Sequence, residues 1–186
     1  MYEFLRGEEA EDDFCYVRFE EGSWYDISGV PTIYTNGSYS YVNENMASGP
    51  LSEMTPVQIS LAGTTIDGPD IQVRVTISSS SDLTSNNSLY LFIAATLDNV
   101  DYEGYNGEKH HQDVFLGWIT DGMNGELLSL AEKEKSKSYT WKMPSNWPQN
   151  NFETTWPQVE WDAANLRVVA FIQDQSTKEV LQVTGI

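Results

Sequence analysis

The chain has 186 residues, a length typical of one domain, or of one domain with a partial second. Its 28 acidic and 10 basic side chains give a formal net charge of −18. This charge argues against a nucleic-acid partner, which would need clustered lysine and arginine, and against docking on an anionic membrane. No apolar run reaches the roughly 18 residues that span a bilayer, so membrane insertion is not expected.

The first 50 residues contain an acidic loop and a predicted hairpin. Residues 7–13 are almost continuously acidic and are expected to be solvated. Asn36 and Gly37 form a turn pair between Tyr34 and Tyr39, which predicts a β-hairpin. Residues 45–53 are the one early helix candidate, and Gly49-Pro50 interrupts them.

After Pro56 the apolar residues recur with a period of two. In residues 71–77 (IQVRVTI) the odd positions are apolar and the even positions are polar, and residues 57–61 follow the same pattern. Such alternation predicts strands with one buried and one exposed face. We expect Gln72 and Arg74 to be exposed, and we expect the following to be buried: Ile71, Val73, Val75, Leu91, Ile93, Val168 and Ala170.

Residues 89–97 (LYLFIAATL) and 166–172 (LRVVAFI, apart from Arg167) are apolar on both faces. They are predicted to be central strands covered on both sides, or strands whose second face meets another element. Shorter strands are expected at 114–120, 127–130, 138–143 and 179–183, and a charged turn after 130 is favoured over a helix at 127–137. Eight strands at this spacing predict an antiparallel β-sandwich of the immunoglobulin-like or jelly-roll-like kind.

Residues 24–37 (WYDISGVPTIYTNG) resemble the part of a thioredoxin-like domain that contains its cis-proline. By this resemblance Pro31 is a structural cis-proline. Downstream, the order of the strand segments and the ending AFIQDQSTKEVLQ are similar to the sandwich domain of the twenty-eight-kilodalton outer-membrane lipoprotein family. The resemblance implies a partial thioredoxin-like segment at 1–50, a β-sandwich domain at 56–186, and a location in the cell envelope or outside the cell.

The thiol chemistry of a thioredoxin-like domain is not expected here. Cys15 is the single cysteine, so the Cys-x-x-Cys half of such a domain is missing. Acidic neighbours in the sequence disfavour the thiolate that a nucleophile needs. No phosphate-binding loop or nucleophile elbow occurs. We therefore expect no enzyme activity and no cofactor.

One loop is a weak candidate for a cation site. Asp98, Asp101 and Glu103 lie near His110 and His111, and they meet the ligand spacing of a calcium loop only loosely. Adjacent histidines on a strand point to opposite faces, which makes a shared metal difficult. In a chain with 28 acidic residues such clusters also arise by chance.

The tryptophan-rich loop near residue 150 is a second candidate. Trp147, Asn150, Asn151 and Trp156 supply the rings, donors and acceptors that a sugar-binding platform uses. The alternative is that these rings cap one end or one edge of the sandwich.

The sequence therefore predicts a non-catalytic, envelope-associated binding or interaction module with a protein or carbohydrate ligand. The first alternative is an accessory fragment of a thioredoxin-like thiol-disulfide lipoprotein whose redox half lies upstream. A carbohydrate-binding sandwich ranks third.

An isolated pair of strands is marginally stable in water. We therefore expect residues 1–50 to pack on the sandwich or on a second copy of the chain, and we favour a homodimer.

Overall fold

The computed structural model of the chain describes residues 33–35, 38–40, 55–67, 70–80, 88–101, 107, 109–120, 124–129, 134–142 and 163–186. The strands, in chain order, are β1 (Ile33–Thr35), β2 (Ser38–Ser40), β3 (Val57–Asp67), β4 (Asp70–Ser79), β5 (Leu89–Leu97), β6 (Val100–Asp101), β7 (His110–His111), β8 (Val114–Trp118), β9 (Glu126–Leu127), β10 (Glu134–Lys142), β11 (Leu166–Asp174) and β12 (Val180–Gly185). A 3-10 helix at Ala163–Asn165 precedes β11. Within these ranges no helix is long and apolar enough to cross a membrane.

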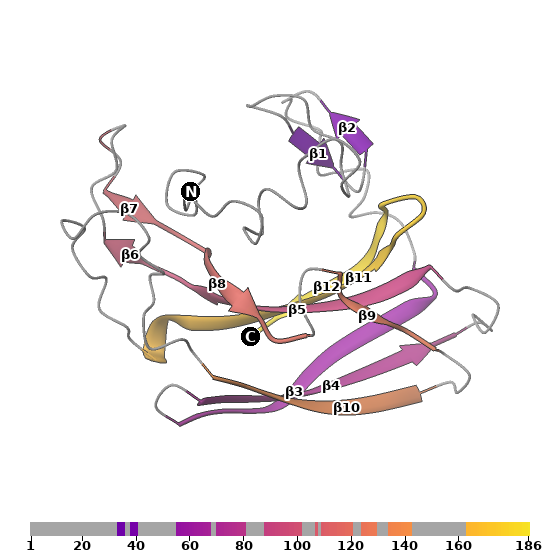
Figure 1. The fold of residues 1–186 in the computed structure, drawn as a ribbon, viewed down its shortest axis with the longest axis horizontal. Coiled ribbons are helices and arrows are strands. Elements are labelled where there is room, and N and C mark those ends of the chain that lie inside the picture. The colour runs from indigo at the N-terminus through magenta and orange to yellow at the C-terminus, as the bar shows by residue number, and fades with distance from the viewer. Residues whose placement is uncertain are drawn as a thin grey trace.

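Two antiparallel sheets form the two layers of a β-sandwich (Figure 1). One sheet has five strands, with the order β12-β11-β5-β8 and with β9 also paired to β5. The other has three strands in the order β10-β4-β3. β3 and β12 lie close together along one side of the sandwich. The predicted fold class, a mainly β antiparallel sandwich, is confirmed.

The core lies between the two sheets and follows the alternation in the sequence. In β4 the side chains of Ile71, Val73, Val75 and Ile77 are buried, while Gln72 and Arg74 are exposed. From the opposite sheet, β5 and β11 contribute the facing wall. Every residue predicted to be buried is buried, and these residues belong to one hydrophobic cluster: Ile71, Val73, Val75, Leu91, Ile93, Val168 and Ala170.

The prediction that 89–97 is a central strand is also confirmed. β5 lies between β11 on one side and β8 and β9 on the other. Leu91 and Ile93 face the core between the sheets, whereas Phe92 and Ala94 point to the other side of the sheet and are buried there as well. β5 thus carries buried apolar side chains on both faces of the five-stranded sheet.

The hairpin predicted at Asn36-Gly37 is present: β1 and β2 pair as antiparallel strands, and Thr35 pairs with Ser38 next to the turn.

The charged turn predicted as far as Lys137 is wrong, because β10 already begins at Glu134. β10 is an edge strand paired with β4 alone. An edge strand accepts charged side chains because they reach solvent past the open side of the sheet.

Several sequence predictions fall outside the described residues. They include Pro31 and its cis bond to Val30, the helix candidate at 45–53 and most of the partial thioredoxin-like segment. These stay predictions, as do the domain limits at 50 and 56.

Candidate functional site

The side of the five-stranded sheet that faces away from the three-stranded sheet is apolar in its central rows, with Thr96, Arg167 and Gln173 in the rows beyond them. Strand pairing sets Phe92 opposite Phe171, and Phe171 opposite Val183. Directly paired residues of antiparallel strands point to the same face and touch. We use the name outer apolar face for the surface made by these rows and their neighbours: Phe92, Ala94, Phe115, Trp118, Leu127, Val169, Phe171 and Val183.

Four aromatic rings form the centre of this face. The rings of Phe92 and Phe171 stack with their centroids 4.9 Å apart and their planes 12° apart. The Trp118 ring lies 5.6 Å from Phe92 and 5.1 Å from Phe115, centroid to centroid. Contacts of this kind add about 0.5–1.5 kcal/mol per pair to the free energy gained by burial. Phe92 has no exposed surface.

Gly125 borders the same cluster. Its φ is +70°, and a Cβ at this position would lie 2.7 Å from two atoms of the Phe92 ring. The backbone before β9 therefore passes directly against the ring, an approach for which glycine is required.

The outer side of the three-stranded sheet is chemically different. Its cross-strand rows join Ser60, Thr76 and Ser136, and then Arg74 and Ser138. The Thr76 and Ser136 hydroxyl oxygens lie 2.8 Å apart in a hydrogen bond. This is the polar, solvated face usual for an antiparallel sheet that packs on one side. The sandwich therefore has one polar and one apolar outer face.

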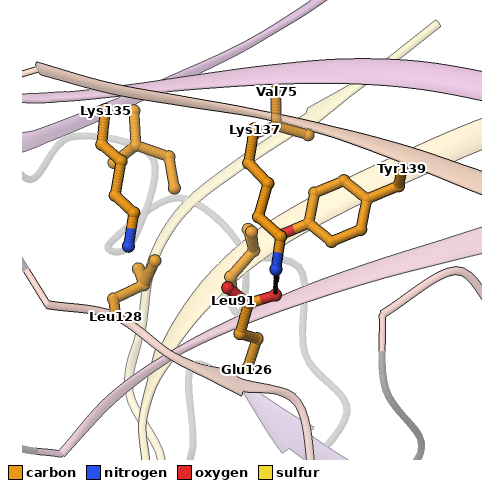
Figure 2. A pocket seen from close by; sticks show the side chains of 8 residues that line it. Val75, Leu91, Glu126, Leu128, Lys135, Lys137 and Tyr139 are labelled. Carbon is orange, nitrogen blue, oxygen red and sulfur yellow. Dashed lines mark hydrogen bonds and ion pairs between the residues drawn. The ribbon is translucent and has the colours of Figure 1, made fainter.

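A small cavity opens between the sheets next to β9 and β10 (Figure 2). Its floor is made of core side chains, including Val75 and Leu91, and Lys135 lies at its rim. It leaves about 10 Å³ of free space, which is the lower limit for one water molecule. An organic ligand does not fit.

Glu126 links the two sheets at the mouth of this cavity. Its carboxylate Oε2 accepts a hydrogen bond from Lys137 Nζ at 2.6 Å and from the Tyr139 hydroxyl at 2.9 Å (Figure 2). Glu126 belongs to β9 of the five-stranded sheet, and the two donors belong to β10 of the three-stranded sheet. Burial, the hydrogen bond to Glu126 and the charge of Glu126 together raise the pKa of Tyr139 above the usual tyrosine value.

Tyr139→Phe is expected to lower the free energy of unfolding by about 1 kcal/mol at neutral pH, through loss of one hydrogen bond. Because the folded pKa of Tyr139 is raised, its contribution is complete below the unfolded pKa of about 10 and is lost as the pH rises above it. Urea titrations at several alkaline pH values should show a smaller loss of stability in the variant than in the wild type. Equal losses of stability in the two proteins would contradict the hydrogen bond from Tyr139 to Glu126.

Two of the residues proposed for a cation site take part in two different ion pairs. Asp98 pairs with Arg167, with 3.8 Å between Oδ2 and Nη2, and Asp101 pairs with His110, with 2.7 Å between Oδ1 and Nδ1. His110 is exposed, while His111 is half-buried. Glu103 lies outside the described residues. In the part of the chain that is described, no three His, Cys, Asp or Glu side chains gather around one point.

The sugar-platform residues Trp147, Asn150, Asn151 and Trp156 all lie outside the described residues. Two other tryptophans are placed. Trp141 packs against the core from β10, and Trp118 belongs to the outer apolar face. The sequence reasoning did not name the outer apolar face as a site, although the two-sided apolar pattern of 89–97 was the signal for it.

Comparison with known proteins supports the fold. No protein-family model matches the sequence, and no curated protein matches it significantly. HBP35 of Porphyromonas gingivalis superposes with a TM-score of 0.64 at 15% identity, over 86% of this chain and 53% of that chain. A domain of the outer membrane lipoprotein Omp28 from the same species gives a TM-score of 0.48 at 19% identity, over 72% of this chain and 88% of that one.

At 15% identity the likeness to HBP35 shows the fold alone. The chain spans about half the length of HBP35. Membership of the lipoprotein family stays a prediction.

Proposed function

We propose that this chain is a non-catalytic interaction module of the cell envelope and that the outer apolar face is its contact surface. The main observation behind the proposal is that the two outer sides of the sandwich differ in polarity: the five-stranded sheet presents aromatic and aliphatic side chains, and the three-stranded sheet presents polar ones. A contiguous apolar surface on a soluble domain marks a site of contact with another polypeptide or element. The polar rows of the three-stranded sheet offer no comparable surface.

The side chains that form the outer apolar face are aromatic and aliphatic. Such groups bind by removing apolar area from water, and they neither transfer protons nor attack substrates. We therefore propose binding without catalysis. In an insulin-reduction assay with dithiothreitol, the protein and its Cys15→Ser variant are expected to leave the rate unchanged. A rate increase that disappears in Cys15→Ser would instead support the thiol-disulfide alternative.

The envelope location is supported by the resemblance of the segments between 57 and 183 to the outer-membrane lipoprotein family. Fractionation of cells that express the chain natively is expected to recover it with the envelope or outside the cell. Recovery in the cytosolic fraction would contradict this part of the proposal.

Hydroxyl-radical footprinting of the full chain tests whether the outer apolar face is occupied. Trp118 and Phe171 are expected to be oxidised much more slowly in the native protein than in the urea-unfolded chain. Ile186, which is 48% exposed at the C-terminus, is the matched control and should show little protection. Protection of Trp118 and Phe171, relative to the unfolded chain, that is no greater than the protection of Ile186 would show an unoccupied surface and overturn the proposal.

A further inference from the structure

We propose that the free edge of β12 is a further binding site, to which an extended segment of another polypeptide adds as an antiparallel strand of the five-stranded sheet. The segment is apolar at alternate positions and carries lysine or arginine between them. This site goes beyond the proposed function, because it binds through the main chain of an edge strand and not through the aromatic side chains of the outer apolar face.

The hydrogen bonds of β12 show which of its main-chain groups point away from β11. Ile186 and Val168 exchange two hydrogen bonds, from Ile186 N to Val168 O at 3.0 Å and from Val168 N to Ile186 O at 2.9 Å. In an antiparallel pair, such residues alternate with residues that do not bond to the neighbouring strand. Gly185 and Val183 belong to this second class, so their N–H and C=O groups point out of the edge of the sheet.

The outward N–H of Val183 is bonded to a side chain and not to a strand. It donates to Oε1 of the neighbouring Gln182 at 3.1 Å, in an exposed hydrogen bond. The carbonyl of an incoming strand can take the place of Oε1 while the Gln182 amide turns to water. A row of outward main-chain groups is the template to which a further strand adds.

The edge of β12 is open to solvent. Val183 is 57% exposed and Gly185 is also exposed, although β3 lies along the same side of the sandwich. The strand Val180–Gly185 contains neither a charged side chain nor a proline, and these are residues that commonly block the addition of a strand. An incoming segment therefore reaches the outward main-chain groups without displacing a packed element.

The place of β12 in the sheet specifies the apolar positions of the partner. Strand pairing puts Phe92, Phe171 and Val183 into one cross-strand row on the outer apolar face. The residue of an added strand that lies opposite Val183 continues this row, and residues two positions away from it lie on the same face. We therefore expect apolar side chains at alternate positions of the partner.

Charge specifies the other positions of the partner. The chain has a net charge of −18, and residues 179–186 contain one charged side chain, the acidic Glu179 directly before β12. A segment with lysine or arginine is attracted by this charge. A second copy of the chain carries the same net charge, which disfavours it at this edge.

β8 lies at the opposite edge of the same sheet and is the main competitor. It is five residues long, and all of its side chains are buried or half-buried. Among the described strands of this sheet, β12 therefore offers the more accessible edge.

Peptide binding to the full chain tests the proposal. The probe is a short fluorescein-labelled peptide in which valine alternates with lysine, and its binding is followed by fluorescence anisotropy. In an added antiparallel strand with a valine opposite Val183, the N–H groups of the valines point toward β12. The matched control peptide is N-methylated at its valines, which keeps its charge and side chains and removes these donors. The first peptide is expected to bind, and the N-methylated peptide is expected not to bind.

Variants of β12 locate the binding site. Val183→Pro removes an outward N–H without removing a hydrogen bond to β11, and it is expected to weaken binding of the peptide by about tenfold or more. Val183→Thr keeps the N–H and the branched shape and is expected to change binding by less than about threefold. Gly185→Pro tests the second outward position and replaces Val183→Pro if thermal melting shows that variant to be unfolded.

Amide hydrogen exchange measured by NMR gives an independent location. Saturating peptide is expected to slow exchange at Val183 and Gly185, whereas Ile186, whose N–H already bonds to Val168, is the control and should change little. No binding at millimolar peptide, equal binding of the N-methylated peptide, or binding that leaves these two amides unprotected would overturn the proposal. Protection that rises with protein concentration in the absence of peptide would identify a second copy as the occupant and would also overturn it.

The outcome is separate from that of the footprinting experiment. A protected footprint at Trp118 and Phe171 with no peptide binding leaves the proposed function standing and removes the β12 site. An unprotected footprint with edge-specific binding of the peptide does the reverse.

Discussion

Phe92→Ala is expected to lower the free energy of unfolding by about 3–5 kcal/mol, the range for deleting a buried aromatic ring. Phe92 has no exposed surface, and its ring stacks on Phe171 at 4.9 Å. The deletion leaves a cavity on the outer side of β5 and removes the centre of the aromatic cluster. Urea unfolding followed by far-ultraviolet circular dichroism measures the loss.

Two control variants show whether the loss of stability is specific to the position of Phe92. Leu91→Ala removes a side chain that faces the core from the same strand and is expected to cost about 2–5 kcal/mol. Gln72→Ala, on the polar outer side of β4, is expected to change stability by no more than about 0.5 kcal/mol. A Phe92→Ala effect as small as that of Gln72→Ala would mean that the outer apolar face is ordinary surface.

Gly125→Ala is expected to destabilise the fold by about 2–5 kcal/mol. Two effects add. A φ of +70° costs a residue with a Cβ about 1–2 kcal/mol, and overpacking a filled site costs about 1–3 kcal/mol. The new Cβ would lie 2.7 Å from the Phe92 ring and 3.0 Å from the Leu91 carbonyl oxygen, and the carbonyl cannot move without disturbing the sheet.

Gly107 provides the matched control for this prediction. Its φ is +80°, and a Cβ built on it would meet nothing within 4 Å. Gly107→Ala is therefore expected to show the backbone effect alone, about 1–2 kcal/mol. Equal losses in Gly107→Ala and Gly125→Ala, measured by urea unfolding, would rule out a contribution from the contact with Phe92.

The elements that could be predicted from the sequence are those whose signal is local. In β4 each odd residue is apolar and each even residue is polar, so its buried face follows from the period alone. The Asn36-Gly37 pair predicted the hairpin of β1 and β2 because Asn and Gly are the residues preferred in two-residue hairpin turns. The apolar pattern of 89–97 correctly indicated a strand covered on both sides.

What could not be predicted depends on pairing between distant segments. Glu126 meets Lys137 and Tyr139 because β9 and β10 belong to different sheets that approach at one edge, and no local pattern encodes that approach. To predict the outer apolar face, one would likewise need to know that Phe171 and Trp118 both lie beside Phe92. The start of β10 was missed because charged residues are usual in turns, whereas their tolerance in an edge strand depends on having a single neighbour.

The edge strand β10 also bears on how copies of this protein avoid aggregation. Of the ten basic side chains in the chain, Lys135, Lys137 and Lys142 lie on β10. A second β10 pairing edge to edge would bring two lysine-bearing strands side by side. Lysines on an exposed edge are a common protection against unwanted sheet extension. The lysines of β10 thus disfavour pairing of this edge with a strand of a second molecule, although the protein as a whole carries a large net negative charge.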